Sequence, residues 1–308
     1  LGSVRGAARK GGPYRDLDAD IRDFFTSLDH GWLEKFLEHR IADKRILRLI
    51  RKWLSAGVIE DGNWSQTMEG APQGASASPL LANVYLHYVF DQWADWWRRR
   101  HARGDVIIVR FADDFTMGFE YQEDAQRFLV ELRERFARFG LELHPDKTRL
   151  IEFGRFAAKN RQARGLGKPE TFDFLGFTHI CARMRDGRFW VRRITISKRM
   201  RAKLREVKDQ LKRRRHQPVP EQGRWLASVV RGYRAYYAVP GNRAAVATFR
   251  TQVTRLWHKA LERRSQRTRI NWARMNRLAT RWLPPARVVH PFPDVRFRAN
   301  TQGRSPVR

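Results

Sequence analysis

Cysteine is nearly missing from this chain of 308 residues, in which Cys181 is the only one. A single cysteine excludes intrachain disulfides and zinc sites built from several cysteines, and it is consistent with a reducing compartment. Long apolar runs are missing too, because no stretch approaches the roughly 20 residues needed to cross a bilayer. The N-terminus, which begins at Leu1, has neither an initiator methionine nor a signal-peptide pattern, and we interpret it as the start of a fragment or of a rearranged gene.

Acidic residues are scarce in one half of the chain only. Residues 181–308 contain 34 Lys and Arg but 6 Asp and Glu, a net charge of +28, whereas residues 1–180 contain 28 and 26, a net charge of +2. A module with so much positive charge repels itself unless it binds a polyanion, and this favours nucleic acid as the partner, bound in a salt-sensitive way. The alternative, an anionic membrane surface, is disfavoured because no long apolar stretch or lipidation signal accompanies the charge.

Hydrophobic periodicity predicts the elements of the first half. Residues 15–21 alternate, so Leu17, Ala19 and Ile21 should face a core from a strand whose aspartates face the other way. Two amphipathic helices should follow. The first is marked by Trp32, Leu33, Phe36 and Leu37; the second is marked by Ile46, Leu49, Ile50 and Trp53, with Asp43 as its cap and Gly57 at its end.

A long apolar helix should begin at Ser78-Pro79, a capping hydroxyl followed by proline, and run toward Trp97. Residues 106–109 and 115–119 then predict the two strands of a hairpin, with Asp113-Asp114 in its tight turn.

Two further elements precede the basic helical region. A helical stripe from Phe128 to Phe139 should end at Gly140. A second hairpin should form around Asp186-Gly187, with residues 177–184 and 188–196 as its arms.

From residue 197 onward the pattern is helical and basic, punctuated by the loop 216–220 and by Pro284-Pro285. Three apolar stripes mark its helices: Met200, Leu204, Val207 and Leu211; Trp225, Val229, Tyr233 and Tyr236; and Val246, Phe249, Val253 and Trp257. The chain therefore predicts a folded helical module with a cationic surface.

Three acidic residues are candidates for chemistry: Asp20 at the end of a strand, and Asp113 with Asp114 at a hairpin turn. Adjacent carboxylates repel each other, and a divalent cation relieves that repulsion. A third carboxylate from a neighbouring strand would complete a site in which two Mg²⁺ ions activate a 3′-hydroxyl and stabilise the leaving pyrophosphate. The alternative is an ordinary solvent-exposed turn, and Asp18, on the same face as Asp20, is a rival ligand.

Five sequence blocks, in order, resemble those of reverse transcriptases, and most closely those of bacterial group II intron reverse transcriptase/maturases. Phe111-Ala112-Asp113-Asp114 resembles the Y-A-D-D box, with Phe in place of Tyr. The other blocks are 20–30, similar to D-I-x-x-F-F…D-H; 70–83, similar to P-Q-G…S-P-L-L-x-N; 141–148, with its Lys-Thr ending; and 174–177, F-L-G-F.

The resemblance implies a role for each matching residue. Asp20, Asp113 and Asp114 would hold two Mg²⁺ ions, with Mn²⁺ as a substitute, and Lys147 would approach the phosphates and protonate the leaving pyrophosphate. Phe25 would be the gate that excludes a 2′-hydroxyl, although it lies in an apolar run and could simply be core, and Lys147 could be an ordinary solvated lysine. The nucleotide site would also include Gln73, Gly74, Phe111 and Ala112, and the primer grip would include Phe174, Leu175 and Gly176.

The basic half carries a weaker resemblance. Residues 226–237 resemble the R-G-W-x-x-Y-Y region of the maturase domain, which in that family binds the intron RNA. Arg213, Arg214, Arg231 and Tyr233 are the expected RNA contacts, and of Tyr233, Tyr236 and Tyr237 at least one should be core packing.

The expected fold is α+β: a palm with an antiparallel sheet flanked by helices, followed by an all-helical basic module. The expected divisions are a flexible remnant at 1–13, a palm with primer-grip hairpin at 14–196, and a thumb and maturase module at 197–308. The family's fingers region precedes its first Asp block, and we expect it to be missing here, because only thirteen residues precede Tyr14.

The expected activity is RNA-directed DNA synthesis from a primer, with dNTPs, an RNA template and a DNA primer as substrates. Group II intron RNA would be the partner in splicing and mobility, in a cytoplasmic ribonucleoprotein and without a membrane. The alternatives are a catalytically inactive RNA-binding splicing factor, a truncated product that folds poorly, and a domesticated antiviral reverse transcriptase, which the maturase-like region disfavours.

Overall fold

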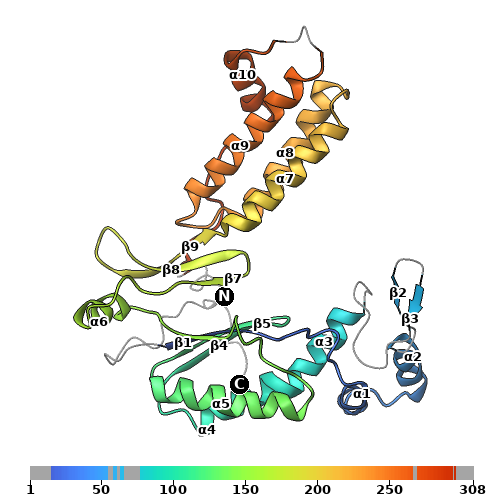
Figure 1. Ribbon diagram of the computed structural model, residues 1–308, viewed down its shortest axis with the longest axis vertical. Helices are drawn as coiled ribbons and strands as arrows, with labels where there is room; N and C mark the ends of the chain where they lie inside the picture. The colour runs from blue at the N-terminus through green and yellow to red at the C-terminus, as the bar shows by residue number, and fades with distance from the viewer. Residues whose placement is uncertain are drawn as a thin grey trace. The chain divides into compact units, whose positions relative to one another are not determined.

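The computed structural model describes residues 15–54, 58–60, 63–65, 77–265, 269–293 and 295. The chain divides into two compact units, and the division lies between Glu170 and Thr171 (Figure 1). Each unit has an antiparallel sheet and a hydrophobic core of its own. This mixture of antiparallel sheet and helices confirms the prediction of an α+β fold.

The sheet of the N-terminal unit has the order β4-β5-β1-β6, all neighbours being antiparallel. Its strands are β1 (Arg15–Asp20), β4 (Val106–Phe111), β5 (Asp114–Phe119) and β6 (Arg149–Glu152). As the alternation predicts, Leu17 and Ala19 of β1 are buried and pair with Met117 and Phe115 of β5. The intervening aspartates of β1 therefore lie on the opposite face of the sheet.

Helices cover the apolar face of this sheet. The helical elements of the N-terminal unit are α1 (His30–Glu38), α2 (Lys44–Leu54), α3 (Ser78–Leu86), the π-helical segment η1 (His87–Asp91), α4 (Gln92–Arg100), α5 (Gln122–Arg138) and α6 (Ala157–Ala163). In Figure 1, α4 and α5 lie along one side of the sheet. Phe119 of β5 packs on Phe128 of α5, with ring centroids 5.5 Å apart. Two short strands, β2 (Val58–Glu60) and β3 (Asn63–Ser65), pair with each other.

The prediction for α2 was right about the helix and about Ile50, and wrong about the other three residues of the apolar stripe. Leu47, Ile50 and Leu54 are buried, whereas Ile46, Leu49 and Trp53 are exposed. Two apolar stripes one residue apart run along this helix, and both have helical spacing, so periodicity alone does not distinguish them. Asp43 caps the helix by accepting a hydrogen bond from the Arg45 amide at 2.8 Å, and Gly57 lies outside the described residues.

The long apolar helix forms as expected but starts differently. Ala77 is its N-cap and makes no side-chain capping bond, so Ser78 is the first helical residue and not the capping hydroxyl. The helix then continues from α3 through η1 into α4. Gly140, with φ of 69°, follows α5 in the left-handed conformation that glycine adopts readily, as the predicted helix end requires.

The described part of the C-terminal unit contains a three-stranded sheet and four helices. Its strands are β7 (Phe172–Phe174), β8 (Phe177–Arg183) and β9 (Phe189–Thr195), and its helices are α7 (Ser197–Arg213), α8 (Val219–Tyr237), α9 (Arg243–Glu262) and α10 (Trp272–Trp282). The predicted hairpin is β8–β9, and Gly187, with φ of 78°, lies in its turn. The predicted stripe of α9, from Val246 to Trp257, is buried in the core of this unit.

The sheet of β7, β8 and β9 belongs to the same compact unit as the C-terminal helices, and not to the unit of the first sheet. The physical reason is packing within this unit: Phe177 of β8 lies 5.8 Å from the ring of Tyr236 and 5.2 Å from that of Tyr237, both in α8. The expected palm at 14–196 therefore remains a prediction about sequence modules, with bounds that differ from those of the compact units. None of the helices in the described part of the chain is long and apolar enough to cross a membrane.

Candidate catalytic site

The turn between β4 and β5 carries the predicted Asp-Asp pair. Asp114 is the first residue of β5 and lies opposite Asp20, the last residue of β1, in the antiparallel register. Cross-strand partners of this kind have Cα atoms about 4.5–5.5 Å apart. Asp113 precedes Asp114 in the turn, after Ala112, whose φ is 55°. The fold thus brings together three carboxylates that are up to 94 positions apart in the sequence.

Lys147 reaches this group through backbone pairing of the 141–148 block with the end of β1. Ile21 and Leu143 form an isolated bridge, and the His144 amide donates to the Asp20 carbonyl at 2.9 Å. The Lys147 ammonium then lies 2.5 Å from Oδ2 of Asp20. The hydrogen bond to Asp20, with the charges of Asp20, Asp113 and Asp114, raises the pKa of Lys147 above its ordinary value. All four predicted catalytic residues therefore lie within electrostatic reach of one another.

Asp18, the rival ligand, has a different partner. It lies opposite Thr116 in the register, two residues farther from the turn, and its Oδ2 is 3.2 Å from the Arg149 guanidinium. Asp16 lies two residues before Asp18, on the same face of β1. Burial, and then the charge of Asp18, raise the pKa of Asp16 to about 7. Position and pairing thus favour Asp20 over Asp18 as the partner of the turn carboxylates.

The donor set fits hard divalent cations, which prefer carboxylate oxygens. As the side chains stand, no group of three or more His, Cys, Asp or Glu residues within the described ranges is arranged to hold a metal ion. The ammonium of Lys147 lies on the Asp20 carboxylate, so one candidate ligand already has a cation beside it. A metal ion would therefore compete with Lys147 for Asp20.

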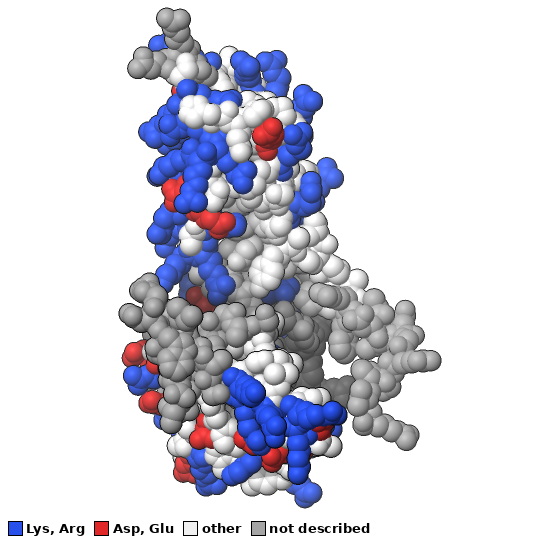
Figure 2. All heavy atoms as spheres, turned by 90° about the vertical axis from the view of Figure 1, so that its right-hand side faces the viewer, with Lys and Arg blue, Asp and Glu red and all other residues white. Residues whose placement is uncertain are grey.

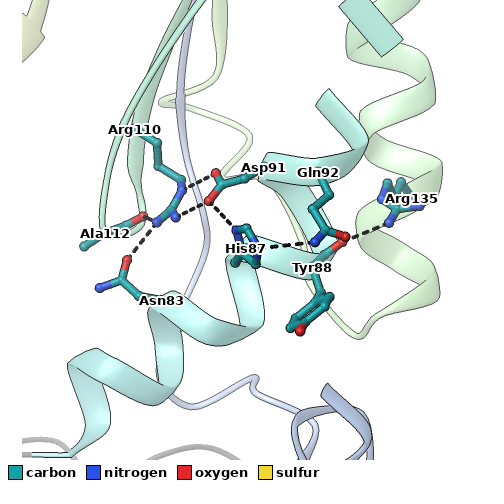
Figure 3. A network of polar contacts seen from close by, with 8 residues as sticks. All are labelled: Asn83, His87, Tyr88, Asp91, Gln92, Arg110, Ala112 and Arg135. Carbon is teal, nitrogen blue, oxygen red and sulfur yellow. Dashed lines mark hydrogen bonds and ion pairs between the residues drawn. The ribbon is translucent and has the colours of Figure 1, made fainter. Parts of the chain in front are cut away.

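Arg110 joins the Asp113-Asp114 turn to the helix beneath it (Figure 3). From β4 its Nε and Nη2 contact the two carboxylate oxygens of Asp91 at 2.7 and 2.5 Å. Its Nη1 donates to the carbonyl of Ala112 at 2.8 Å and to Oδ1 of Asn83 at 2.9 Å. Because Ala112 immediately precedes Asp113, this guanidinium holds the backbone from which the two candidate metal-binding carboxylates project.

The π-helical segment that carries Asp91 is itself held by α5. Arg135 donates from Nε to the carbonyl of Val89 at 2.5 Å and from Nη2 to that of Tyr88 at 3.2 Å. A π-helical turn disturbs the ordinary hydrogen-bond ladder, and such segments are frequent at functional sites. His87 of the same segment lies beside Asp91, with 3.7 Å between Nδ1 and Oδ2 (Figure 3).

Arg110 and Asp91 were not among the residues expected from the sequence to form the site. The available signal was the isolated charge of each residue within an otherwise apolar segment: Arg110 after 106–109, and Asp91 within the helix expected to run toward Trp97. Two opposite isolated charges in apolar elements are costly unless they pair, which they do here.

The predicted nucleotide-site residues differ in environment. Phe25 is partly buried and packs against the core, with its ring 5.5 Å from that of Phe24, which is fully buried. Phe111, in the place of the family's tyrosine, is 64% exposed beside the turn. Gln73 and Gly74 lie outside the described residues. Asp29, at the end of the first block, has a structural role, because it caps α1 by accepting from the Trp32 amide at 2.7 Å.

In the C-terminal unit the F-L-G-F block forms a tight hairpin turn. Leu175 and Gly176 have φ of 48° and 79°, and Phe174 pairs with Phe177 across the turn, as in a type I′ hairpin. Phe174 and Gly176 are buried, and the Leu175 carbonyl accepts a hydrogen bond from the Tyr236 hydroxyl at 2.8 Å. Of the three predicted primer-grip residues, Leu175 alone is partly exposed.

The predicted RNA contacts of this unit lie in three different environments. Arg213 and Arg231 are exposed, whereas the guanidinium of Arg214 lies 5.2 Å from the centre of the Trp225 ring. The prediction for Tyr233 was wrong. Tyr233 is buried and stacks on Phe249 with ring centroids 3.6 Å apart, so it is the expected core tyrosine and is not available to RNA.

Comparison with known proteins identifies the family of the chain. Residues 5–179 match the family model for reverse transcriptase (RNA-dependent DNA polymerase), which is more than half of the chain. The chain therefore belongs to the reverse transcriptase family.

The chain is also similar to individual relatives. Group II intron-encoded protein LtrA of Lactococcus lactis subsp. cremoris is 40% identical over 77 residues, which cover 25% of this chain and 13% of that protein. Protein YkfC of Escherichia coli (strain K12) is 30% identical over 165 residues, covering 44% of this chain and 42% of the relative. The similarity to a group II intron-encoded protein confirms the resemblance seen in the sequence blocks, and the chain spans less than half the length of these relatives.

Among solved structures, that of apo telomerase from Candida tropicalis aligns with 87% of this chain and 46% of its own, at 11% identity and a TM-score of 0.47.

Proposed function

We propose that this protein extends a DNA primer on an RNA template, using dNTPs and two divalent metal ions held by Asp20, Asp113 and Asp114. The observation that supports this most directly is the register that places Asp20 opposite Asp114, next to Asp113, with Lys147 in contact with Asp20. Bound Mg²⁺, or Mn²⁺ in its place, would supply activation of the 3′-hydroxyl and charge neutralisation at the leaving pyrophosphate.

The residues of the chain would do the rest. Lys147 carries a positive charge near neutral pH, as a lysine ordinarily does, and the carboxylates beside it raise its pKa further. It would stabilise the departing pyrophosphate and protonate it. Arg110 would hold the turn so that Asp113 and Asp114 keep their positions when charge develops. Phe25 would pack under the sugar and exclude a 2′-hydroxyl, so that Phe25→Ala should admit ribonucleotides with roughly 10- to 100-fold less discrimination.

Primer extension on a homopolymeric RNA template tests the polymerase proposal. Asp113→Asn and Asp20→Asn should abolish extension while leaving RNA affinity nearly unchanged, since each removes a ligand charge and little volume. Asp18→Asn is the matched control from the same face of β1 and should retain activity. Equal loss with Asp18→Asn, or loss of RNA binding in parallel with extension, would contradict this assignment of ligands.

We propose a second role for the C-terminal unit, which is binding of structured RNA such as a group II intron within a cytoplasmic ribonucleoprotein. Lys and Arg crowd the surface of its helices, with few Asp or Glu between them (Figure 2), and residues 181–308 carry a net charge of +28. If the wild-type protein binds intron RNA and promotes its splicing but extends no primer, the alternative of a splicing factor without polymerase activity is correct.

A further inference from the structure

A groove of about 480 Å³ opens between α9 and α10, within the C-terminal unit. Thr251 and Arg255 line it from successive turns of α9. Trp272, Asn276 and Thr280 line it from successive turns of α10, each four residues after the last. Its volume lies in the range of small-ligand sites, and no Asp or Glu is among the described residues that line it.

Trp272 lines this groove, and one face of its indole is covered by another side chain. The ring stacks on His258 with centroids 4.4 Å apart and an interplanar angle of 15°, yet the residue is 50% exposed. His258 is buried and is fixed in turn, because its Nε2 lies 2.6 Å from the Ile270 carbonyl oxygen and its Nδ1 lies 3.4 Å from Glu262. One face of the indole is therefore held by the protein, and the ring remains accessible as a rigid stacking surface.

The two arginines of the groove differ in what they already bind. Arg250 donates to the carbonyls of Ala279 and Pro284, at 3.1 Å each, so its guanidinium closes the C-terminal end of α10. Arg255 is exposed and makes no hydrogen bond or ion pair with another described residue. Arg255 is thus the guanidinium in the groove that is available to an incoming anion.

We propose that this groove binds one unpaired nucleotide of an RNA strand. The base stacks on Trp272, the phosphate pairs with Arg255, and Asn276 and Thr280 offer hydrogen bonds to the edge of the base. Proteins hold single-stranded RNA by this combination of aromatic stacking and cationic contact with the backbone. An unpaired nucleotide is required, because a base within a duplex is covered on both faces. The inference rests on the proposed RNA-binding role of this unit and adds a particular site and ligand to it.

Equilibrium binding of a single-stranded RNA and of a duplex RNA to the full chain, over a range of salt concentrations, tests the groove. Trp272→Ala should weaken binding of the single strand about 10-fold or more, leave binding of the duplex unchanged, and leave the salt dependence unchanged. Arg255→Gln should reduce the slope of log affinity against log salt by about 0.7 for the single strand. Trp272→Phe, which retains a stacking surface, should keep most of the affinity.

Two controls match these variants. Trp96→Ala removes another half-exposed tryptophan, which lies beside His101 in the N-terminal unit. Arg201→Gln removes an exposed arginine of α7 that lies outside the groove. The proposal is overturned if Trp272→Ala weakens single-strand binding no more than Trp96→Ala does, or if it weakens duplex binding as much as single-strand binding. It is also overturned if Arg255→Gln and Arg201→Gln change the salt slope by the same amount.

Wild-type primer extension, measured on the same preparation, separates this inference from the polymerase proposal. Absence of extension together with groove-dependent binding would count against the polymerase and support the groove. Normal primer extension by the wild type, together with normal RNA binding by Trp272→Ala, would overturn the proposed nucleotide site and leave the polymerase proposal standing.

Discussion

Arg110 and Asp91 form a two-point ion pair that joins the strand before the Asp113-Asp114 turn to the π-helical segment beneath it, and the same guanidinium holds the carbonyl of Ala112. Ala112 has a positive φ, which costs a residue with a side chain about 1–3 kcal/mol, so its conformation depends on such contacts. Arg110→Gln should therefore lower kcat for primer extension by roughly 10- to 100-fold, because a small misplacement of catalytic groups has effects of this size. The KM for dNTP and the affinity for RNA should change little.

Single and double variants distinguish positioning from general destabilisation. Asp91→Asn should resemble Arg110→Gln, and the double variant should be little worse than either alone, since both remove one interaction. Arg127→Gln is the control, because it breaks an ion pair with Asp124 that lies away from the turn. If Arg127→Gln lowers kcat as much as Arg110→Gln at equal loss of thermal stability, the positioning role is refuted.

Lys147 and a divalent cation are expected to compete for Asp20. With the ammonium 2.5 Å from Oδ2, Lys147→Met should raise the affinity for Mn²⁺, measured by electron paramagnetic resonance on the protein without nucleic acid. The same variant should lower kcat at saturating metal, because it removes the positive charge of Lys147 that would stabilise the leaving pyrophosphate. Lys159→Met, at an exposed lysine of α6, is the control. Unchanged Mn²⁺ affinity in Lys147→Met would show that the ammonium does not compete.

The position of the carboxylates follows from local patterns in the sequence. Alternation in 15–21 defines which face of β1 carries Asp20, and the apolar arms around Asp113-Asp114 define a hairpin. Once strand 15–21 pairs with this hairpin, Asp20 lies beside the two aspartates of the turn. The sequence blocks add Lys147, because the segment that contains it pairs with the end of β1.

Other features depend on tertiary choices that periodicity does not encode. In α2 two apolar stripes compete, and the stripe of Leu47, Ile50 and Leu54 is the buried one. Asp91, the partner of Arg110, lies in a π-helical segment. The side chains of such a segment do not follow the spacing of 3.6 residues per turn, so helical periodicity does not predict which way Asp91 points. Tyr233 fits an RNA-binding motif by sequence, but its place opposite Phe249 in the core decides its role.

Two glycines of α8 predict opposite effects of the same substitution. A Cβ at Gly223 would lie 2.6 Å from ring atoms of Trp282, whereas nothing lies within 4 Å of a Cβ at Gly232. Gly232→Ala should raise the free energy of unfolding by about 0.5–1 kcal/mol through helix propensity. Gly223→Ala should lower it by about 1–3 kcal/mol through overpacking. Urea denaturation of the two variants checks both signs, and stabilisation by Gly223→Ala would contradict the packing of α8 on α10.

His179 predicts that the C-terminal unit loses stability in mild acid. It is buried in β8 and stacks on Phe172 with ring centroids 4.7 Å apart. Burial, and then the charge of Arg193, lower the pKa of His179 to about 4 in the folded protein, from 6.5. Between these values the unfolded chain binds the proton and the folded chain does not, so stability falls as pH decreases from 6.5 toward 4.

The size of this effect and its assignment to His179 can be measured together. A shift of this size corresponds to about 3 kcal/mol lost by pH 4, since one pKa unit is worth about 1.4 kcal/mol. Hydrogen exchange of the β8 amides at pH 7 and pH 5 reports the local free energy of opening. His179→Gln removes the titration, so its β8 amides should lose less protection on acidification than those of the wild type. His216→Gln, at an exposed histidine of the same unit, should behave as the wild type. If His179→Gln and the wild type lose protection equally between these pH values, groups other than His179 govern the acid sensitivity of this sheet.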